Sequence, residues 1–95
     1  MRLEWDEDKR VANFGKHRLA FEDVELVFVG NVVTFEDDRV DYGERRLISL
    51  GQLEGRTVVV VHSARVDSTR IISFRKANSR EQQIYQERLG EDRQP

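Results

Sequence analysis

Residues 46–74, RLISLGQLEGRTVVVVHSARVDSTRIISF, contain three successive β-strand patterns and decide the fold of this chain. Apolar and β-branched residues predict strands over 46–50, 57–63 and 69–74. The two connections between these strands have the length of hairpin turns, so the strands should form an antiparallel meander. The middle strand is apolar on both faces, so we expect it to be central and covered by a helix on at least one side.

Two helices are predicted before the meander. Residues 2–5 form a strand stub, and Asp6 is a good N-cap for a first helix. That helix should end at about Lys16 or His17, and its polar face carries residues at spacings of three and four: Lys9, Asn13, Lys16 and His17. A second helix is predicted over 21–28, where the apolar residues share one stripe and Gly30-Asn31 ends it.

The remaining segments complete an α+β domain. Residues 32–35 predict a further strand, and 37–44 read as a polar loop. A last helix should start at Asn78 or Ser79, because either residue can form a capping box, and should continue to about Leu89 before Gly90 ends it. The expected fold is therefore two N-terminal helices, a twisted four-stranded antiparallel sheet and a C-terminal helix. Residues 1–90 form a single domain, and residues 91–95 form a charged, disordered tail.

Composition narrows the classes of function. The chain has 95 residues, no cysteine and two histidines, which excludes a disulfide framework or thiolate zinc site and leaves too few ligands for a typical metal cage. We therefore expect no metal and no cofactor. The N-terminus has no apolar core of a signal peptide, and the longest apolar run is far shorter than a membrane span. The expected location is the cytoplasm, without membrane association.

Charge is segregated along the chain although the net charge is only -2. Residues 62–80 contain five fixed positive charges against the single Asp67, whereas residues 22–44 are strongly acidic. A cationic segment suits a polyanion, and phosphodiesters are the commonest polyanions in a cell. The alternative, equally open from composition, is that the arginines pair with the acidic segment on the surface.

Metal-free RNA cleavage requires a base for the 2′-hydroxyl, cations for the phosphorane and an acid for the leaving 5′-oxygen. His17 lies near a helix C-terminus, where the dipole favours the imidazolium, so it is a candidate acid, or simply a helix cap. His62 follows four valines and is better explained as a strand residue bonded to a neighbour. Lys9 would act as a point charge, or as an acid or base.

Arginines and aromatic residues raise two further alternatives. Strand alternation points Arg70 and Arg75 to opposite faces unless a bulge intervenes, so one is expected to bind phosphate while the other anchors the sheet to a helix. Trp5 could stack on a base, as exposed aromatics do in single-strand binders, but an aromatic beside a helix start is more often a core staple.

Sequence blocks spread over most of the chain resemble the BrnT toxins of type II toxin-antitoxin modules. They are Glu4-Trp5-Asp6-Glu7-x-Lys9, Asn13-x-x-Lys16-His17, Phe21-Glu22-x-Val24, Val27-Phe28, Tyr42-Gly43-Glu44-x-Arg46, Gly51, Arg70-Ile71-Ile72-Ser73-x-Arg75-Lys76-Ala77 and Arg80-Glu81-x-x-x-Tyr85. The resemblance implies a RelE-like ribonuclease fold and inhibition of translation through RNA cleavage. It also implies neutralisation by a BrnA-type antitoxin, typically a ribbon-helix-helix dimer, in a 2:2 assembly that binds operator DNA through the antitoxin and represses its own promoter.

The residues and the resemblance together give a working hypothesis for the site. The expected catalytic residues are Lys9, His17, Arg70 and Arg75. The expected RNA-binding residues are Trp5, Lys16, His62, Arg65, Lys76 and Arg80. The alternative function is a non-catalytic partner that binds the antitoxin and modulates its DNA binding and autorepression.

Overall fold

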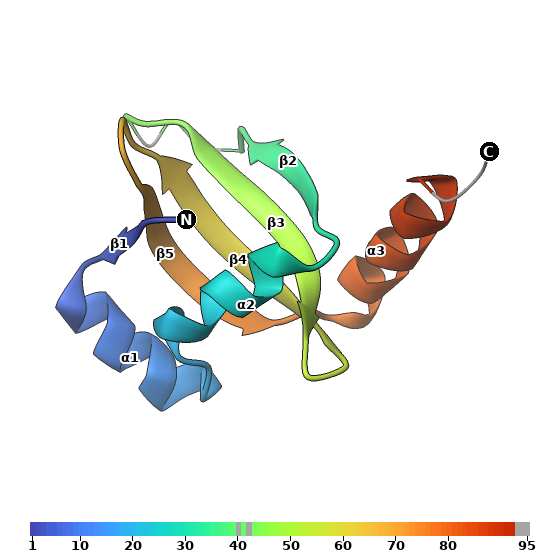
Figure 1. The fold of residues 1–95 in the computed structure, drawn as a ribbon, viewed down its shortest axis with the longest axis horizontal. Coiled ribbons are helices and arrows are strands. Elements are labelled where there is room, and N and C mark those ends of the chain that lie inside the picture. The colour runs from blue at the N-terminus through green and yellow to red at the C-terminus, as the bar shows by residue number, and fades with distance from the viewer. Residues whose placement is uncertain (40, 42, 93–95) are drawn as a thin grey trace.

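The computed structural model describes residues 1–39, 41 and 43–92, and within them the chain forms a mixed sheet of five strands in the order β1-β5-β4-β3-β2 (Figure 1). The strands are β1 (Leu3–Trp5), β2 (Val33–Asp37), β3 (Arg46–Leu53), β4 (Arg56–Ala64) and β5 (Thr69–Lys76). The helices are α1 (Glu7–His17), α2 (Val24–Val29), which follows a 3-10 turn over Phe21–Asp23, and α3 (Ser79–Asp92). The predicted α+β class is confirmed.

The antiparallel meander is confirmed as well. β3 pairs with β4 and β4 with β5, both antiparallel, and β2 pairs antiparallel with β3. Glu54 and Gly55 join β3 to β4 with φ angles of 51° and 78°. Two successive residues with positive φ match the twist of the flanking strands, and glycine at the second position adopts this conformation without a steric cost.

The prediction of a four-stranded, purely antiparallel sheet is wrong in one respect. Residues 3–5 are not an isolated stub but a fifth strand, which pairs in parallel with β5 in the register Leu3↔Thr69 to Trp5↔Ile71. A parallel partner must be supplied from a distant part of the chain, because the connection between parallel strands is a crossover. Here all elements from α1 to β4 separate the two strands in the sequence, although the strands are neighbours in the sheet (Figure 1).

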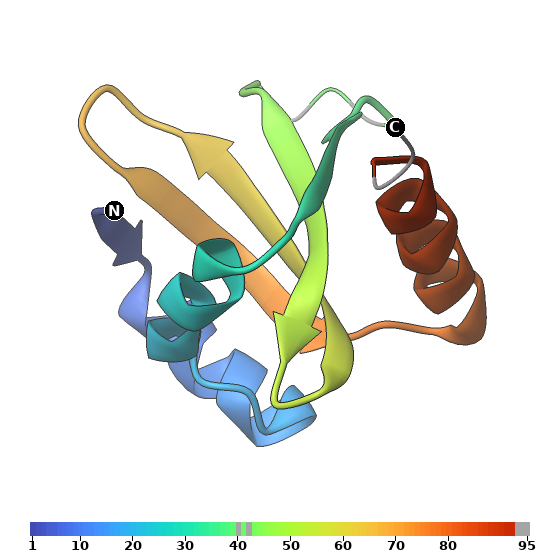
Figure 2. The ribbon, with the colours of Figure 1, turned by 45° about the vertical axis from the view of Figure 1, so that its right-hand side comes forward.

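Helices cover both faces of the sheet, as Figure 2 shows, with α1 and α2 on one side and α3 on the other. The first face buries a cluster of residues from the helices and alternate strand positions: Phe21, Val24, Val27, Val58, Val60, Ile71 and Phe74. The second face buries a smaller cluster under α3: Val33, Leu50, Val59 and Tyr85. Three of the four valines of β4 therefore supply both cores, Val58 and Val60 on one face and Val59 on the other, as a central strand should.

Helix ends follow the predicted capping chemistry at two of three sites. The Asp6 side chain accepts hydrogen bonds from the backbone N–H groups of Asp8 and Lys9 at 2.9 and 3.2 Å. At the start of α3, Glu81 N–H donates to Asn78 Oδ1 at 2.8 Å and Asn78 N–H donates to Glu81 Oε1 at 2.9 Å, a complete capping box. The turn before α2 has Ala20 at its N-cap position and no side-chain cap.

The C-terminal boundary differs from the prediction. α3 continues through Gly90, where it was predicted to end, to Asp92, so the helix extends into the first two residues of the segment predicted as a tail. Residues 93–95 of that predicted tail lie outside the described residues, as do residues 40 and 42 of the polar loop predicted over 37–44. No helix in the described part of the chain is long and apolar enough to cross a membrane.

Candidate functional site

A shallow hollow lies where α1 packs against β5, in the part of β5 that does not pair with β1. It has a volume of about 310 Å³ and is lined by Lys9, Ala12, Asn13, Lys16, His17 and Ile72. The polar residues of this set recur at spacings of three and four along α1 and therefore share one helix face. Lys9 and Lys16 are exposed, and neither forms an ion pair with a carboxylate of the described residues. The hollow thus presents two cations and an imidazole to solvent.

Asn13 fixes α1 in this position. Its Nδ2 donates to the carbonyl oxygen of Phe74 at 2.8 Å and to that of Leu19 at 3.3 Å, and Phe74 N–H donates to Asn13 Oδ1 at 3.1 Å. β1 pairs with only the first part of β5, so Phe74 has no neighbouring strand on that side. The buried amide of Asn13 satisfies both backbone groups in place of a strand.

The charge state of His17 differs from the expectation. The pKa of His17 is lowered from its usual value of 6.5, first by burial and then by the positive charges of Lys16 and Arg75. The helix dipole would favour the imidazolium, but burial and two nearby cations oppose it and prevail. The neutral imidazole is therefore favoured, which suits a base better than the acid predicted from the sequence. The Arg75 guanidinium also lies within electrostatic reach of the imidazole.

Arg75 connects the edge of the sheet to α3. Its Nη1 and Nη2 donate to Glu81 Oε1 and Oε2, each at 2.8 Å, in a two-bonded fork. The hydrogen bonds to Glu81 raise the pKa of Arg75, and the same bonds lower the pKa of Glu81. The Arg75 side chain remains 36% exposed, so the guanidinium is held in place while one part of it faces solvent.

A bulge in β5 changes the direction of its side chains. Val61 pairs with Ser73 but His62 pairs with Ile71, so Ile72 is an extra residue. Ile71 and Phe74 consequently lie in the same core cluster although three residues separate them. The neighbouring Arg70 and Arg75 therefore both lie on the α3 side of the sheet, which is the outcome foreseen if a bulge intervened.

Arg70 is nevertheless not brought to the hollow. Its Nη1 lies 3.6 Å from Glu4 Oε2, at the end of β5 that pairs with β1. Their partners on β4, Ser63 and Val59, are four residues apart, so at 3.3 Å per residue the two arginines lie about 13 Å apart along the sheet. The two side chains are held in separate ion pairs, Arg70 with Glu4 and Arg75 with Glu81. Of the two, Arg75 is the arginine whose charge acts on His17, although it is not among the residues that line the hollow.

His62 lies in the interior with only 6% of its surface exposed, so the structure does not bring its ring to the surface, where the expected RNA-binding role would require it. Its side chain forms an edge contact with Phe28, with ring centroids 5.3 Å apart, and its Nε2 is 2.8 Å from Ser49 Oγ. Ser49 Oγ in turn is 2.7 Å from Thr34 Oγ1. Burial lowers the pKa of His62, which favours the neutral ring. The alternative reading, a strand residue satisfied by a neighbour, is confirmed.

Trp5 packs on the core as a staple does. Its ring makes an edge contact with Phe21, with centroids 6.0 Å apart, and it adjoins the cluster under α1 and α2. The ring is only partly exposed, so the structure favours packing over base stacking for this residue.

The other predicted RNA-binding cations are divided between ion pairs and open surface. Arg65 donates to Glu44 Oε2 at 3.2 Å, so for this residue pairing with the acidic segment is the correct description. Arg70 and Arg75 pair instead with carboxylates outside that segment. Lys76 and Arg80 are exposed at the end of β5 and in the first turn of α3.

Three residues that shape the site were not assigned a role from the sequence. Asn13 appeared only as part of a polar face and Glu81 only as half of a capping box, while Ile72 carried no polar signal at all. The role of Asn13 can be recognised only when its distant partner Phe74 is known. The same holds for Glu81, whose carboxylate bonds to Arg75 as well as to the cap residue Asn78. Within the described residues, no group of three or more His, Cys, Asp or Glu side chains could hold a metal ion.

Comparison with known proteins identifies the family. A family model described as the ribonuclease toxin BrnT of type II toxin-antitoxin systems matches residues 5–81, which include the hollow, Arg75 and Glu81. A search of curated proteins finds no significant match. Because the family match covers most of the chain, this protein belongs to the BrnT family of type II toxin-antitoxin ribonuclease toxins.

Proposed function

We propose that this chain is a metal-independent endoribonuclease that arrests translation by cleaving RNA at the hollow between α1 and β5. The observation that carries the proposal is the grouping of Lys9, Lys16 and His17 on one helix face, within electrostatic reach of Arg75. Cations suited to phosphate and an imidazole that favours its neutral form are the groups that such a reaction needs.

The chemistry follows from these groups. The neutral His17 imidazole takes the proton of a 2′-hydroxyl, and the 2′-oxygen attacks the adjacent phosphorus. Arg75 and the exposed lysines stabilise the charge that builds on the phosphorane. The bond to the 5′-oxygen breaks, and Lys9 or Lys16 supplies the proton for that leaving oxygen. The products are a 2′,3′-cyclic phosphate and a free 5′-hydroxyl.

Arg70 has a different role in this proposal. It is paired with Glu4 and lies about 13 Å along the sheet from Arg75. We propose that it anchors β1 to β5, while Arg75 serves the phosphate. This division differs from the expectation that one arginine binds phosphate while the other anchors the sheet to a helix, because Arg75 itself pairs with Glu81 of α3 and Arg70 pairs with Glu4 of β1.

Family membership supports an antitoxin partner, and we propose that it is of the BrnA type, in a 2:2 complex that binds operator DNA through the antitoxin. The proposed location is the cytoplasm, where RNA and operator DNA are both present. Masking of the α1 and β5 surface by the antitoxin would neutralise the nuclease.

The test is cleavage of a 5′-labelled RNA by the purified protein, with and without EDTA. We expect cleavage to survive EDTA and to fall at least a hundredfold in His17→Ala and Arg75→Ala, as loss of an acid-base group or a charge-stabilising group does. Arg45→Ala is the matched control, because Arg45 is an exposed arginine paired with Glu36 on another part of the sheet. Cleavage that EDTA abolishes, or that both site variants retain, would refute the proposed mechanism.

A second function, antitoxin binding without catalysis, is favoured by a separate observation. Arg70 and Arg75 already have carboxylate partners, and apolar side chains are exposed on α1 and α2: Val11, Phe14, Leu26 and Val29. Such a surface suits a protein partner. This function predicts tighter operator binding by the complex than by the antitoxin alone, together with normal growth when the free chain is expressed.

A further inference from the structure

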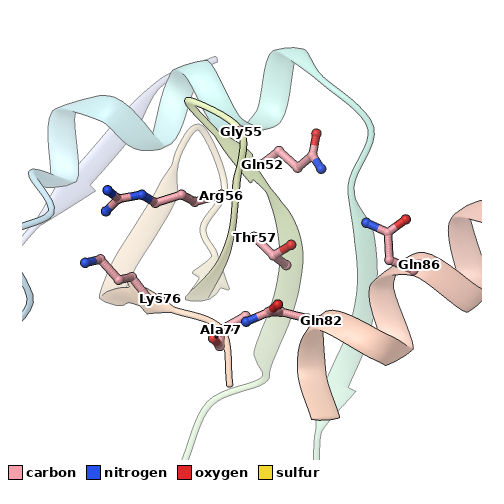
Figure 3. A pocket seen from close by; sticks show the side chains of 8 residues that line it. All are labelled: Gln52, Gly55, Arg56, Thr57, Lys76, Ala77, Gln82 and Gln86. Atoms are coloured by element: carbon pink, nitrogen blue, oxygen red, sulfur yellow. Dashed lines mark hydrogen bonds between the residues drawn. The ribbon is translucent and has the colours of Figure 1, made fainter. Parts of the chain in front are cut away.

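A second hollow lies between the β3–β4 hairpin, the end of β5 and the first two turns of α3 (Figure 3). Its volume is about 390 Å³. The residues that line it are Gln52, Gly55, Arg56, Thr57, Lys76, Ala77, Gln82 and Gln86. We call it the amide pocket, because three of its side chains are glutamines.

The lining separates cations from amides. In Figure 3, Arg56 and Lys76 extend in the same direction on one side, and the amide groups of Gln52 and Gln86 lie on the other side. Thr57 and Gln82 lie between them. No carboxylate is among the lining residues, so an anionic ligand would meet no repulsion from the walls. A ligand that fits this arrangement has a negative group at one end and a hydrogen-bonding edge at the other.

The floor of the pocket is held by local hydrogen bonds. Ala77 N–H donates to the carbonyl oxygen of Thr57 at 3.0 Å, which ties the end of β5 to β4. Gln82 Nε2 donates to the carbonyl oxygen of Ala77 at 3.2 Å, which leaves the amide oxygen of Gln82 as an acceptor. Gln52 and Gln86 form no side-chain hydrogen bond with any described residue, so both amides are available to a ligand.

A nucleotide has both a negative group and a hydrogen-bonding edge, as the lining of the pocket requires. Its phosphate suits Arg56 and Lys76, and its base edge carries neighbouring donors and acceptors that a carboxamide can match with two parallel hydrogen bonds. Each amide offers a donor and an acceptor, so a set of amides distinguishes bases by their pattern of hydrogen-bonding groups. Apolar ligands fit poorly, because Ala77 is the largest apolar side chain in the lining.

The amide pocket adjoins the proposed cleavage site. Lys76 follows Arg75 on β5, and Gln82 follows Glu81 on α3, so the Arg75–Glu81 pair is next to the amide pocket along both elements. An RNA strand with a phosphate at Arg75 would therefore bring a neighbouring nucleotide to the amides.

We propose that the amide pocket binds one nucleotide of the RNA and reads its base, and so sets the sequence preference of cleavage. Its part in cleavage rests on the proposed function, but its binding of a nucleotide does not. Gln52 and Gln86 are the residues that read the base, and Arg56 and Lys76 hold the phosphate.

The direct test is a titration of the ¹⁵N-labelled protein with each of the four 5′-mononucleotides and, separately, with inorganic phosphate, followed by NMR. We expect the side-chain amide signals of Gln52 and Gln86 to shift with one nucleotide more than with the others. Gln52→Ala and Gln86→Ala should each weaken that binding about tenfold, the loss expected for one amide–base contact. Gln83→Ala is the control, because Gln83 lies on the same helix outside the pocket and bonds to Glu87.

Two results would overturn the inference. One is a titration in which nucleotides shift these amides no more than inorganic phosphate does. The other is equal affinity for all four nucleotides in wild type and variants. A cleavage assay on RNA of mixed sequence tests the role of the pocket in cleavage. Gln52→Ala and Gln86→Ala should cleave with a weaker base preference than wild type. An unchanged base preference would show that the pocket has no part in cleavage. If wild type does not cleave at all, the proposed function fails, while the titration still decides whether the pocket binds a nucleotide.

Discussion

Asn13 on α1 bonds to both backbone polar groups of Phe74 on β5, with Nδ2 donating to the Phe74 carbonyl at 2.8 Å and Phe74 N–H donating to Oδ1 at 3.1 Å. One buried side chain thus replaces a neighbouring strand and sets the distance between the helix face and the strand edge. The position of Lys9, Lys16 and His17 relative to Ile72 depends on this contact.

We expect Asn13→Ala to lower the free energy of unfolding by about 2–4 kcal/mol, because two buried backbone groups lose their partners. Urea denaturation measures the effect. Asn31→Ala, at an exposed asparagine, should change stability by less than about 0.5 kcal/mol. Equal effects of the two substitutions would show that the Asn13 contact contributes little.

Alanine substitutions at two glycines should change stability in opposite directions. A Cβ at Gly51 would lie 2.6 Å from Val27 Cγ1 and 3.1 Å from Val32 Cγ1, so Gly51→Ala forces α2 away from β3 and should destabilise by about 1–3 kcal/mol. At Gly15 a Cβ meets nothing within 4 Å, and Gly15→Ala should stabilise α1 by about 0.5–1 kcal/mol. Thermal unfolding distinguishes the two signs. If the clash is the cause, Gly51→Ala and Val27→Ala together should cost less than the sum of the two single substitutions, because Val27→Ala removes the clashing methyl group.

Stability should depend on pH through His62. Burial lowers the pKa of His62 below its usual value of 6.5, so the unfolded chain binds a proton that the folded chain resists. The free energy of unfolding should therefore fall as pH decreases below about 6.5, and His62→Gln should remove much of that slope between pH 7 and 5. His17→Gln, at a less buried histidine, should remove less of it. Slopes that neither substitution changes would contradict this prediction.

Glu81 should stabilise the fold only while it is ionised. Its pKa is lowered from 4.5, chiefly by the hydrogen bonds from Arg75, so its contribution is complete above that pH and is lost as pH falls through the lower folded pKa. We expect Glu81→Gln to cost about 1–2 kcal/mol at pH 7, since a neutral amide weakens both the fork and the cap. The difference from wild type should shrink as pH decreases below 4.5. A difference that stays constant down to acidic pH would argue against the ion pair.

The pKa of His17 should respond to its two cationic neighbours. Since Lys16 and Arg75 lower it, Lys16→Ala and Arg75→Ala should each raise the midpoint of the His17 titration toward 6.5, as measured by NMR. Arg45→Ala should leave the midpoint unchanged. In the cleavage assay, a base with a lowered pKa predicts a rate that is constant at neutral pH and decreases in acid below 6.5, a decrease absent from the residual activity of His17→Ala.

Much of the secondary structure could be predicted from local sequence. Asp6 and the pair Asn78–Glu81 placed two helix starts correctly, and the alternation over residues 46–74 predicted the meander with its hairpin at Gly55. The polar face of α1 was also correctly predicted as the side that carries Lys9, Lys16 and His17. These features depend on residues that are close in the sequence, within one or two helical turns or within a single hairpin.

The site depended on contacts that no local pattern contains. Pairing of β1 with β5, the bulge at Ile72 and the bond from Asn13 to Phe74 join residues that are remote in the sequence. They decided that the charge of Arg75 acts on His17 while Arg70 pairs with Glu4, that His62 faces the core, and that burial, together with two cations, lowers the pKa of His17. The sequence by itself determined the helices, the meander and the family, because capping, periodicity and turns act over short range. Only the tertiary structure decided register, burial and charge environment, because each of these is set by the partners that the completed sheet brings together.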